Sequence, residues 1–229
     1  MNWCHLALSF VLCFQVTSFS NADDKVATPF NGKDLSGWKI KGDNKDKSKW
    51  TVALAKVDQG GKLVVEPASG SGELVNAAGG GVDIFTEAKF GDCVVALEVM
   101  VPKGSNSGVY LMGNYELQIL DSFGKEKVGP GDLGGIYGAA APKLNAAKAP
   151  GEWQTLEIDF TAPKFTDGKK SANARFNKVV LNGQVIHENI EVKGVTGGSL
   201  GQGEQATGPL MFQGDHGAVA FRKIRISTK

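Results

Sequence analysis

Cysteine is scarce in this chain of 229 residues, which contains only Cys4, Cys13 and Cys93. The first two lie within residues 1–22, a segment without Lys, Arg, Asp or Glu that surrounds the apolar run LALSFVLCFQV. An apolar run of this length, followed by small residues, is typical of a signal peptide, and we expect cleavage near Ala22. The one cysteine that remains cannot cross-link its own chain, so burial of apolar surface must hold the mature fold together.

The N-terminal segment has two other interpretations. A membrane anchor would need about 18 or more apolar residues. Lipoprotein processing at Cys13 would need a smaller residue than Leu12 in front of it. We therefore predict export to the periplasm or the extracellular space, no membrane span once residues 1–22 are removed, and one mature domain over residues 23–229.

An excess of charge of either sign is also missing. The chain has 25 Lys and Arg against 24 Asp and Glu, a formal net charge of +1, and no basic block. This balance argues against nucleic acid as a partner and suits a neutral ligand such as a sugar. No nucleotide-binding glycine motif follows a predicted strand, so we do not expect the chain to perform redox chemistry with a dinucleotide.

Helical periodicity is absent from the mature sequence. Short β-prone runs recur instead, separated by Gly, Asn, Asp and Pro. The Asn182-Gly183 pair between two apolar runs predicts a tight hairpin over residues 180–185. These features together predict an all-β fold, a two-sheet antiparallel sandwich from about residue 27 to residue 228.

Two glycine-rich segments, residues 70–82 and 127–152, are expected to be long loops. Connections of this length are usually functional or disordered. The second segment carries Tyr137 and Lys143 and directly follows the run YELQILDS, residues 115–122. We therefore expect it to place polar side chains over the face that this run presents.

The run YELQILDS places polar residues in a β-prone stretch. Because strand side chains alternate between faces, Glu116 and Gln118 share one face and Leu117 takes the other. Asp121 joins the first two only if the strand carries a one-residue bulge. The sequence thus predicts a carboxylate, an amide and a second carboxylate lined along one groove.

Several motifs resemble, in the same order, those of one family of exported bacterial domains. They are FNGKDLSGW, GSNSGVYLMGNYELQILDS, GGIYGAAAPKLNAAKAPGEWQTLEIDF, LNGQVIHEN and GPLMFQGDHGAVAFRKIRI, and they cover Phe30 to Ile226. The family is the 3-keto-disaccharide hydrolase domain family. The resemblance implies a jelly roll of the concanavalin A-like lectin/glucanase type.

In glucanases of this fold the catalytic strand reads Glu-x-Asp-x-x-Glu. The resemblance puts Glu116, Gln118 and Asp121 in those three places. A retaining glycosidase needs two carboxyls about 5–5.5 Å apart. Because the amide of Gln118 cannot ionise, this departure argues against ordinary glucanase chemistry.

The resemblance implies a different reaction on a sugar oxidised at C3. The ketone acidifies the C2 proton, so the glycosidic bond breaks by elimination and water then adds back. This route needs a base, an acid and a group that polarises the ketone. We name Glu98, Glu116, Asp121 and His216 as catalytic candidates, and we expect a separate oxidoreductase to supply the ketone.

Each candidate also has a structural interpretation. Glu98 could face solvent on a half-buried strand, and Asp121 could cap a turn. Gln118 could fix a loop backbone, and His216 could be a turn residue. The alternative function is a non-catalytic carbohydrate-binding or surface-interaction module of the same fold.

Four residues are expected to bind substrate. Tyr110 and Tyr137 suit stacking on a sugar, Gln118 suits hydrogen bonding, and Lys143 is a further candidate unless it is a solvated loop charge. Other residues are assigned to structure: Trp38, Trp50, Trp153 and Cys93 to the core, and His187 to the outer face of the hairpin.

A metal site is conceivable but is not part of the prediction. Glu98, Glu116, Gln118 and His216 would suit a divalent cation if they converged. No dense Asp/Asn ligand loop is present, and the run GPGDLGG offers only Asp132. We therefore predict neither a metal nor a cofactor.

Overall fold

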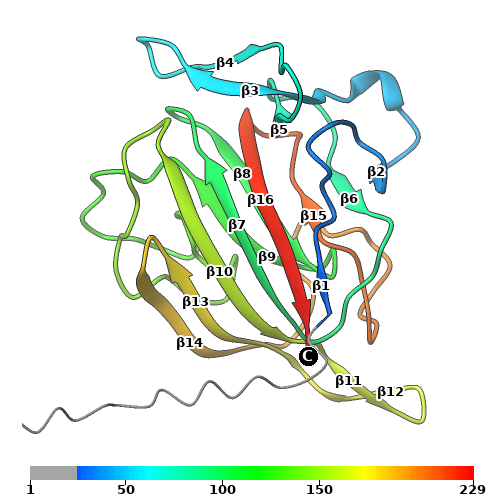
Figure 1. Cartoon of the computed structure of the whole chain (residues 1–229). Coiled ribbons are helices and arrows are strands. Elements are labelled where there is room, and N and C mark those ends of the chain that lie inside the picture. The colour runs from blue at the N-terminus through cyan, green and yellow to red at the C-terminus, as the bar shows by residue number, and fades with distance from the viewer. Residues whose placement is uncertain (1–24) are drawn as a thin grey trace, which may run out of the picture.

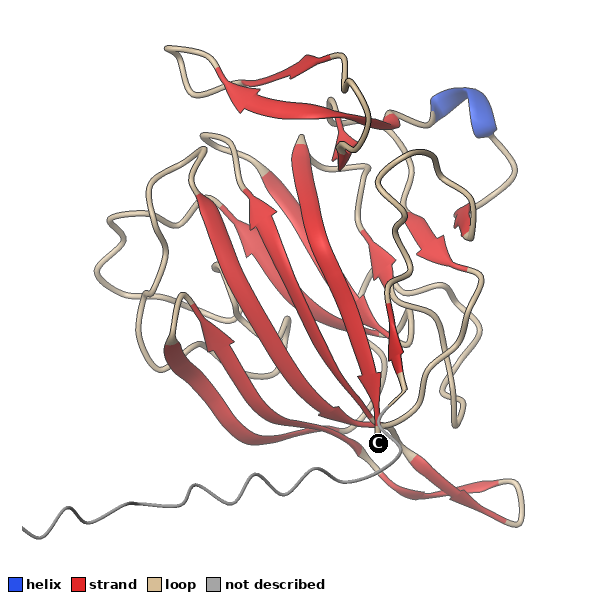
Figure 2. Ribbon diagram, in the orientation of Figure 1, coloured by secondary structure: helices blue, strands red, loops and turns tan. Residues whose placement is uncertain are grey.

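The computed structural model describes residues 25–229. The predicted signal peptide lies outside the described residues. Within them every paired strand is antiparallel, and the helical structure is one 3₁₀ turn, η1 (Lys45–Lys47). Figure 2 shows this all-β composition, which confirms the predicted antiparallel sandwich. No helix in this part of the chain is long and apolar enough to cross a membrane.

The larger sheet has nine strands, one of which, β1, pairs only with the C-terminal strand. In spatial order they are β14 (Gln184–Val192), β13 (Ala174–Leu181), β10 (Trp153–Thr161), β7 (Cys93–Met100), β16 (Val219–Thr228), β5 (Glu73–Asn76), β3 (Trp50–Val57) and β4 (Leu63–Glu66), with β1 (Val26–Ala27) beside β16. The segment 70–82, expected to be a loop, therefore contains a strand of this sheet.

The smaller sheet has five strands and lies behind the larger one in Figure 1. Its order is β2 (Trp38–Ile40), β6 (Ile84–Thr86), β15 (Met211–Phe212), β8 (Asn106–Leu111) and β9 (Tyr115–Leu120). A separate hairpin, β11 (Lys164–Thr166) with β12 (Lys169–Ala172), projects away from both sheets. Because β9 ends the order of the smaller sheet, its outer edge is available to other segments.

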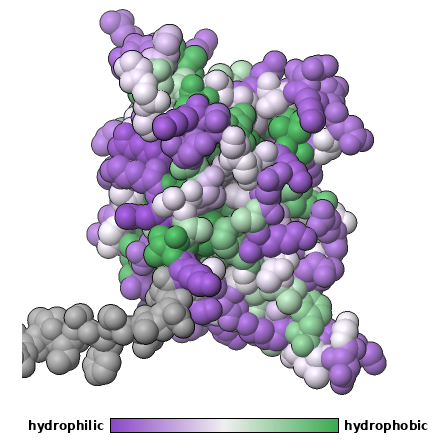
Figure 3. Space-filling model, turned by 45° about the vertical axis from the view of Figure 1, so that its right-hand side comes forward, coloured by the Kyte–Doolittle hydropathy of each residue, from purple (hydrophilic) through white to green (hydrophobic). Residues whose placement is uncertain are grey.

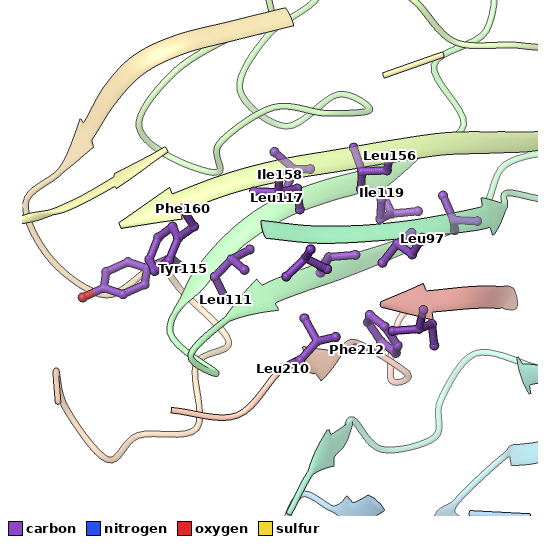
Figure 4. Close-up of a cluster of buried hydrophobic side chains, with 14 of the residues drawn as sticks. Leu97, Leu111, Tyr115, Leu117, Ile119, Leu156, Ile158, Phe160, Leu210 and Phe212 are labelled. Carbon is purple, nitrogen blue, oxygen red and sulfur yellow. The ribbon is translucent and has the colours of Figure 1, made fainter. Parts of the chain in front are cut away.

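The core fills the space between the two sheets. Figure 4 shows Leu117 and Ile119 of β9 pointing towards Leu156 and Ile158 of β10, and all four are almost fully buried. The rings of Phe212 on β15 and Phe221 on β16 stack at 3.9 Å between centroids. Apolar contact across the gap, rather than hydrogen bonding, joins the two sheets.

The residues assigned to the core reach it, with one exception. Trp38, Trp50 and Cys93 are buried, and burial raises the pKa of the Cys93 thiol to about 12. Trp153 instead lies on the outer face of the larger sheet, where the Arg222 guanidinium sits 4.0 Å from its ring centroid. This differs from the prediction because β10 turns residues 154, 156 and 158 inwards.

The hairpin joining β13 and β14 forms as predicted. Asn182 and Gly183 both take the left-handed conformation, with φ of 51° and 79°, that a two-residue turn requires. The prediction for His187 is wrong. Its ring is buried, and Nε2 donates to the Gly134 carbonyl oxygen at 2.8 Å, because the segment 127–152 folds over this face of β14.

The segment 127–152 also pairs with the free edge of β9. Gln118 N donates to the Gly135 carbonyl oxygen at 2.8 Å, and Gly134 N donates to the Gln118 carbonyl oxygen at 2.8 Å. Ile136 forms an antiparallel bridge with Leu117. The long segment therefore satisfies the polar edge of β9 and is held against it.

The face shown in Figure 3 is mostly hydrophilic. On the face shown in Figure 3, hydrophobic residues form separate patches between hydrophilic ones. Among the described residues, seven large hydrophobic side chains are exposed: Val26, Val64, Val65, Phe123, Tyr137, Leu144 and Val195. Single exposed apolar residues are ordinary, so only those that cluster need an explanation.

Candidate functional site

The candidate site forms on the face of β8 and β9 that points away from the core. Tyr110 lies opposite Glu116, and Gly108 lies opposite Gln118, without any shift of register. Because Leu117 points into the core in Figure 4, alternation turns Glu116 and Gln118 to the opposite face. The polar side chains therefore share one surface while the apolar ones pack the sandwich.

Gly108 makes room for the carboxylate of Glu116. A Cβ atom at position 108 would lie against Oε1 of Glu116 and 2.9 Å from Cε2 of Tyr110. The Glu116 side chain thus lies across the backbone of the neighbouring strand. A glycine at position 108 is required by this close approach and not by an unusual φ.

These side chains line a cavity of about 220 Å³, which we call the Glu116 pocket. Loops that follow other strands complete its walls. The residues that line it are Asn106, Tyr110, Glu116, Gln118, Tyr137, Gly197, Gly198, Gln213 and His216.

The carboxyl of Glu116 is almost fully buried, with 3% of the residue exposed. Burial raises its pKa from 4.5 to about 7; a hydrogen bond with Tyr110 and the charge of His216 oppose the rise, whereas the charges of Asp83 and Asp215 add to it. A carboxyl with a pKa near neutrality can both accept and donate a proton.

The hydroxyl of Tyr110 lies between two acceptors. It donates to the Gly197 carbonyl oxygen at 3.0 Å, and it is also within hydrogen-bonding reach of Glu116. One hydroxyl hydrogen serves one acceptor at a time, so the neutral acid of Glu116 can donate to the oxygen of Tyr110. Burial, and then the charge of Glu116, raise the pKa of Tyr110, which keeps its hydroxyl protonated.

His216 lies at the rim of the Glu116 pocket and is half exposed. Its Nδ1 donates to Oδ1 of Asp215 at 2.5 Å, which orients the ring. The side chain of Asn76 holds the backbone on both sides, since Nδ2 donates to the carbonyl oxygens of Gly214 at 2.9 Å and Gly217 at 2.7 Å. Glu116 and His216 therefore share one pocket.

Gln118 lines the pocket and also fixes the neighbouring strand. Its Nε2 donates to Oδ1 of Asn106 at 2.7 Å and to the Ser107 carbonyl oxygen at 2.9 Å. The structural role considered for Gln118 is thus real, and it does not remove the residue from the site.

Sequence reasoning missed Gln213. This residue is 7% exposed and lines the Glu116 pocket, and its Oε1 atom is buried without a hydrogen-bond partner. A buried acceptor without a partner costs about 1–3 kcal/mol. A donor on a ligand would satisfy it. Gln213 lies inside the motif GPLMFQGDHG, but neither charge nor spacing distinguishes it there.

A second missed residue, Asp83, fixes two walls of the pocket. Its carboxylate accepts from Lys41 Nζ at 3.0 Å and from Gly214 N at 3.0 Å. Lys41 Nζ also donates to the Gly198 carbonyl oxygen at 2.5 Å. This network connects the segments that contribute Gly198 and Gln213 to the pocket.

The expectation that Glu98 lies on a strand beside Glu116 is wrong. Glu98 is on β7 in the other sheet, and Leu97 points into the core, so Glu98 faces outwards. Its carboxylate accepts from Arg222 Nε at 2.6 Å and Lys223 Nζ at 2.7 Å. Burial opposes ionisation, but these bonds hold the pKa of Glu98 below its usual value.

Asp121 also lies outside the pocket. Strand β9 ends at Leu120 without the bulge that would have turned Asp121 to the face of Glu116. Its Oδ2 accepts from Gly104 N at 2.8 Å, and Oδ1 accepts from Phe123 N at 3.4 Å. Asp121 therefore caps a turn, which is the structural alternative considered for it.

Of the remaining substrate-binding candidates, Tyr137 and Tyr110 line the Glu116 pocket and Lys143 does not. Lys143 is exposed and forms an ion pair with Glu188 on β14, away from the Glu116 pocket. Tyr137 is 45% exposed and lines the pocket, with its N–H donating to the Glu116 carbonyl oxygen at 3.1 Å. The ring of Tyr110 is buried, so it offers its hydroxyl and not a platform for stacking.

The four residues considered for a divalent cation do not converge, because Glu98 belongs to the other sheet. Within residues 25–229, no group of three or more His, Cys, Asp and Glu side chains is arranged to hold a metal ion.

Comparison with known proteins gives a family and a fold. A model of the 3-keto-alpha-glucoside-1,2-lyase-like domain matches residues 25–227. A 3-keto-disaccharide hydrolase of Bacteroides thetaiotaomicron is 31% identical over 107 residues, which are 47% of this chain and 33% of that protein. The match thus spans about a third of the relative's length.

Two solved structures from Parabacteroides distasonis, each named a "putative glycosyl hydrolase", are similar. One is 28% identical with a TM-score of 0.68 and covers 89% of this chain and 84% of its own. The other is 20% identical with a TM-score of 0.59, covers 89% and 94%, and supports the fold alone. The family model matches nearly the whole described part, and the chain therefore belongs to the 3-keto-alpha-glucoside-1,2-lyase-like domain family.

Proposed function

We propose that this protein is an exported carbohydrate-active enzyme that cleaves 3-keto-glycosides by acid and base chemistry in the Glu116 pocket. The observation that carries the proposal is the buried carboxyl of Glu116. It has a pKa of about 7, and it shares one pocket with the hydroxyl of Tyr110 and the ring of His216. The family and the named relative support the substrate class.

The proposed reaction is an elimination followed by addition of water. The carboxylate of Glu116 removes the proton from C2, the electron pair forms the C1–C2 double bond, and the C1–O bond breaks. The leaving oxygen takes a proton from His216 at the rim. Glu116 then returns its proton to C2 while the hydroxyl of a water adds to C1 and the other proton of that water goes to His216, so both side chains are regenerated and the sum is hydrolysis.

The ketone oxygen gains negative charge in the first step and needs donors. The amide Nε2 of Gln213 is one donor near Gly198, and the hydroxyl of Tyr110 is a second once its hydrogen turns from the Gly197 carbonyl oxygen to the ketone. Preorganised donors of this kind stabilise a developing oxyanion with little reorganisation. A reaction with Glu116 as the base and His216 as the acid needs no covalent nucleophile. This agrees with the presence of Gln118, whose amide cannot ionise, on the same strand.

The ketone must come from a separate reaction. Oxidation of the C3 hydroxyl needs an electron acceptor, and we assign that step to a separate oxidoreductase. The enzyme proposed here would act on the product of that oxidation.

The test compares a 3-keto-glycoside with its unoxidised parent. Purified wild-type protein and the Glu116→Gln variant are incubated with both, and the released sugar is quantified. Release from the keto form by the wild-type protein alone supports the proposal. Binding of both compounds without turnover of either would instead identify a carbohydrate-binding module.

A further inference from the structure

A second cavity adjoins the Glu116 pocket. It measures about 510 Å³ and is lined by residues 137–139 and 191–197; we call it the side pocket. Tyr137 and Gly197 line both cavities, so the two meet at these residues. A ligand longer than the first cavity would enter the second at this boundary.

Both walls of the side pocket are attached to the backbone of Glu116. Tyr137 N donates to the Glu116 carbonyl oxygen at 3.1 Å, which fixes the first wall. Glu116 N donates to Oγ1 of Thr196 at 3.0 Å, and Thr196 N donates to the Asn114 carbonyl oxygen at 2.9 Å, which fix the second. The side pocket therefore has a defined position relative to the carboxyl that performs the proposed chemistry.

The side pocket has a mixed lining, in which the charged residues Glu191 and Lys193 accompany two exposed apolar side chains. Tyr137 and Val195 are each 45% exposed and both line it, although only seven large hydrophobic side chains of the described part are exposed at all. Exposed apolar residues that gather in a concave site mark ligand contact. A sugar ring, with one apolar face of C–H groups, suits an exposed tyrosine ring beside a valine.

The size of the Glu116 pocket points the same way. Its volume of about 220 Å³ is below the roughly 300–1,000 Å³ typical of small-molecule sites. It holds part of a disaccharide, and the remaining part must lie elsewhere.

We infer that the side pocket binds the leaving half of the substrate, a second sugar ring or an aglycone of similar size, with Tyr137 and Val195 against its apolar face. This inference rests on the proposed function, because it places the oxidised ring in the Glu116 pocket. It assigns Val195 as a residue that determines preference for disaccharides over small glycosides.

The test uses two substrates with the same 3-keto-glucose ring, a disaccharide and its methyl glycoside. We expect Val195→Lys to lower kcat/KM for the disaccharide about tenfold and to leave the methyl glycoside within about twofold. Val64→Lys, at an exposed valine on β4 that lines neither cavity, should change neither. Equal loss for both substrates, or no loss for either, would overturn the inference.

A second variant, which fills the side pocket, should change substrate preference in the same direction. Nothing lies within 4 Å of a Cβ built on Gly194, which lines the side pocket and has no left-handed φ. Gly194→Leu should therefore fold normally and discriminate against the disaccharide alone. Unchanged preference for the two substrates would count against the side pocket.

Failure of the proposed function is distinguishable from failure of this inference. If the wild-type protein cleaves neither keto substrate, the proposed function is wrong, and calorimetric titration with an unoxidised disaccharide and its methyl glycoside tests the side pocket. The disaccharide should bind more tightly, and Val195→Lys should abolish the difference. Equal affinity of wild-type protein for the two compounds would overturn the inference.

Discussion

The carboxylate of Glu116 lies where a side chain at position 108 would be, so Gly108 on β8 determines how Glu116 on β9 is placed. The two residues belong to neighbouring strands of the smaller sheet. Their contact brings the carboxyl beside Tyr110 and away from solvent. The raised pKa of Glu116 is a consequence of that burial.

Substitution of Gly108 by Ala should reduce activity without unfolding the protein. The added Cβ would meet Oε1 of Glu116 and the ring of Tyr110, and the carboxylate would have to move. A displacement of about 1 Å at a reacting group costs up to about 10²-fold, so we expect kcat/KM to fall at least about tenfold. Gly91→Ala is the matched control, because its Cβ would find ordinary contacts at 3.4 Å or more.

Replacement of Glu116 by Gln should abolish most turnover while keeping the fold. The amide has nearly the same shape but cannot take a proton, and a general acid or base is worth about 10²–10⁴-fold. Steady-state kinetics on a 3-keto-glycoside measures the loss, and circular dichroism checks the fold. Glu87→Gln, on an exposed residue paired with Lys39, serves as the control. Full activity of Glu116→Gln would remove Glu116 from the mechanism.

Stability should fall as pH rises from about 4.5 to about 7. The Glu116 carboxyl ionises near 4.5 in the unfolded chain but keeps its proton to about pH 7 when folded. Between these values the folded state binds more protons, so the free energy of unfolding decreases with rising pH, by at most about 3 kcal/mol. Denaturant unfolding of wild-type protein and Glu116→Gln at pH 5 and pH 8 measures the effect. The variant should lack this part of the pH dependence.

Substitution of Glu98 by Gln should leave catalysis intact. The Glu98 carboxylate bonds to Arg222 and Lys223 on the outer face of the larger sheet and does not reach the Glu116 pocket. We expect kcat/KM within about twofold of wild type and a loss of stability of about 0.5–2 kcal/mol, since a charge-assisted bond is weakened. A loss of turnover comparable with that of Glu116→Gln would show that the outer face takes part in the reaction.

The alternation of residues in local runs was enough to predict much of the fold. Polar residues at alternate positions of YELQIL required Glu116 and Gln118 to share a face, because strand side chains have a period of two. The Asn182-Gly183 pair required a tight turn, because few residue pairs adopt two positive φ angles in succession. Both predictions depend only on neighbours in the chain.

The composition of the site depended on contacts that no local pattern contains. Glu98 and Glu116 both interrupt apolar β-prone runs, yet the pairing of β7 with β10 and β16 places Glu98 in the other sheet. The prediction for Asp121 required a bulge, and the regular register of β8 with β9 left it at the turn. Gln213 enters the pocket because β15 pairs with β8, at a separation of about a hundred residues.

The sequence by itself determined the class of fold, the face of β9 that carries Glu116, and the family. Those properties follow from side-chain alternation, turn chemistry and ordered motifs, all of which are local in the chain. Only the tertiary structure decided which acids meet, because sheet order and register bring distant segments together. The Glu116 carboxyl is buried by Gly108, Tyr110 and the loop before Gly198, which are contacts of this kind. Its raised pKa results from that burial.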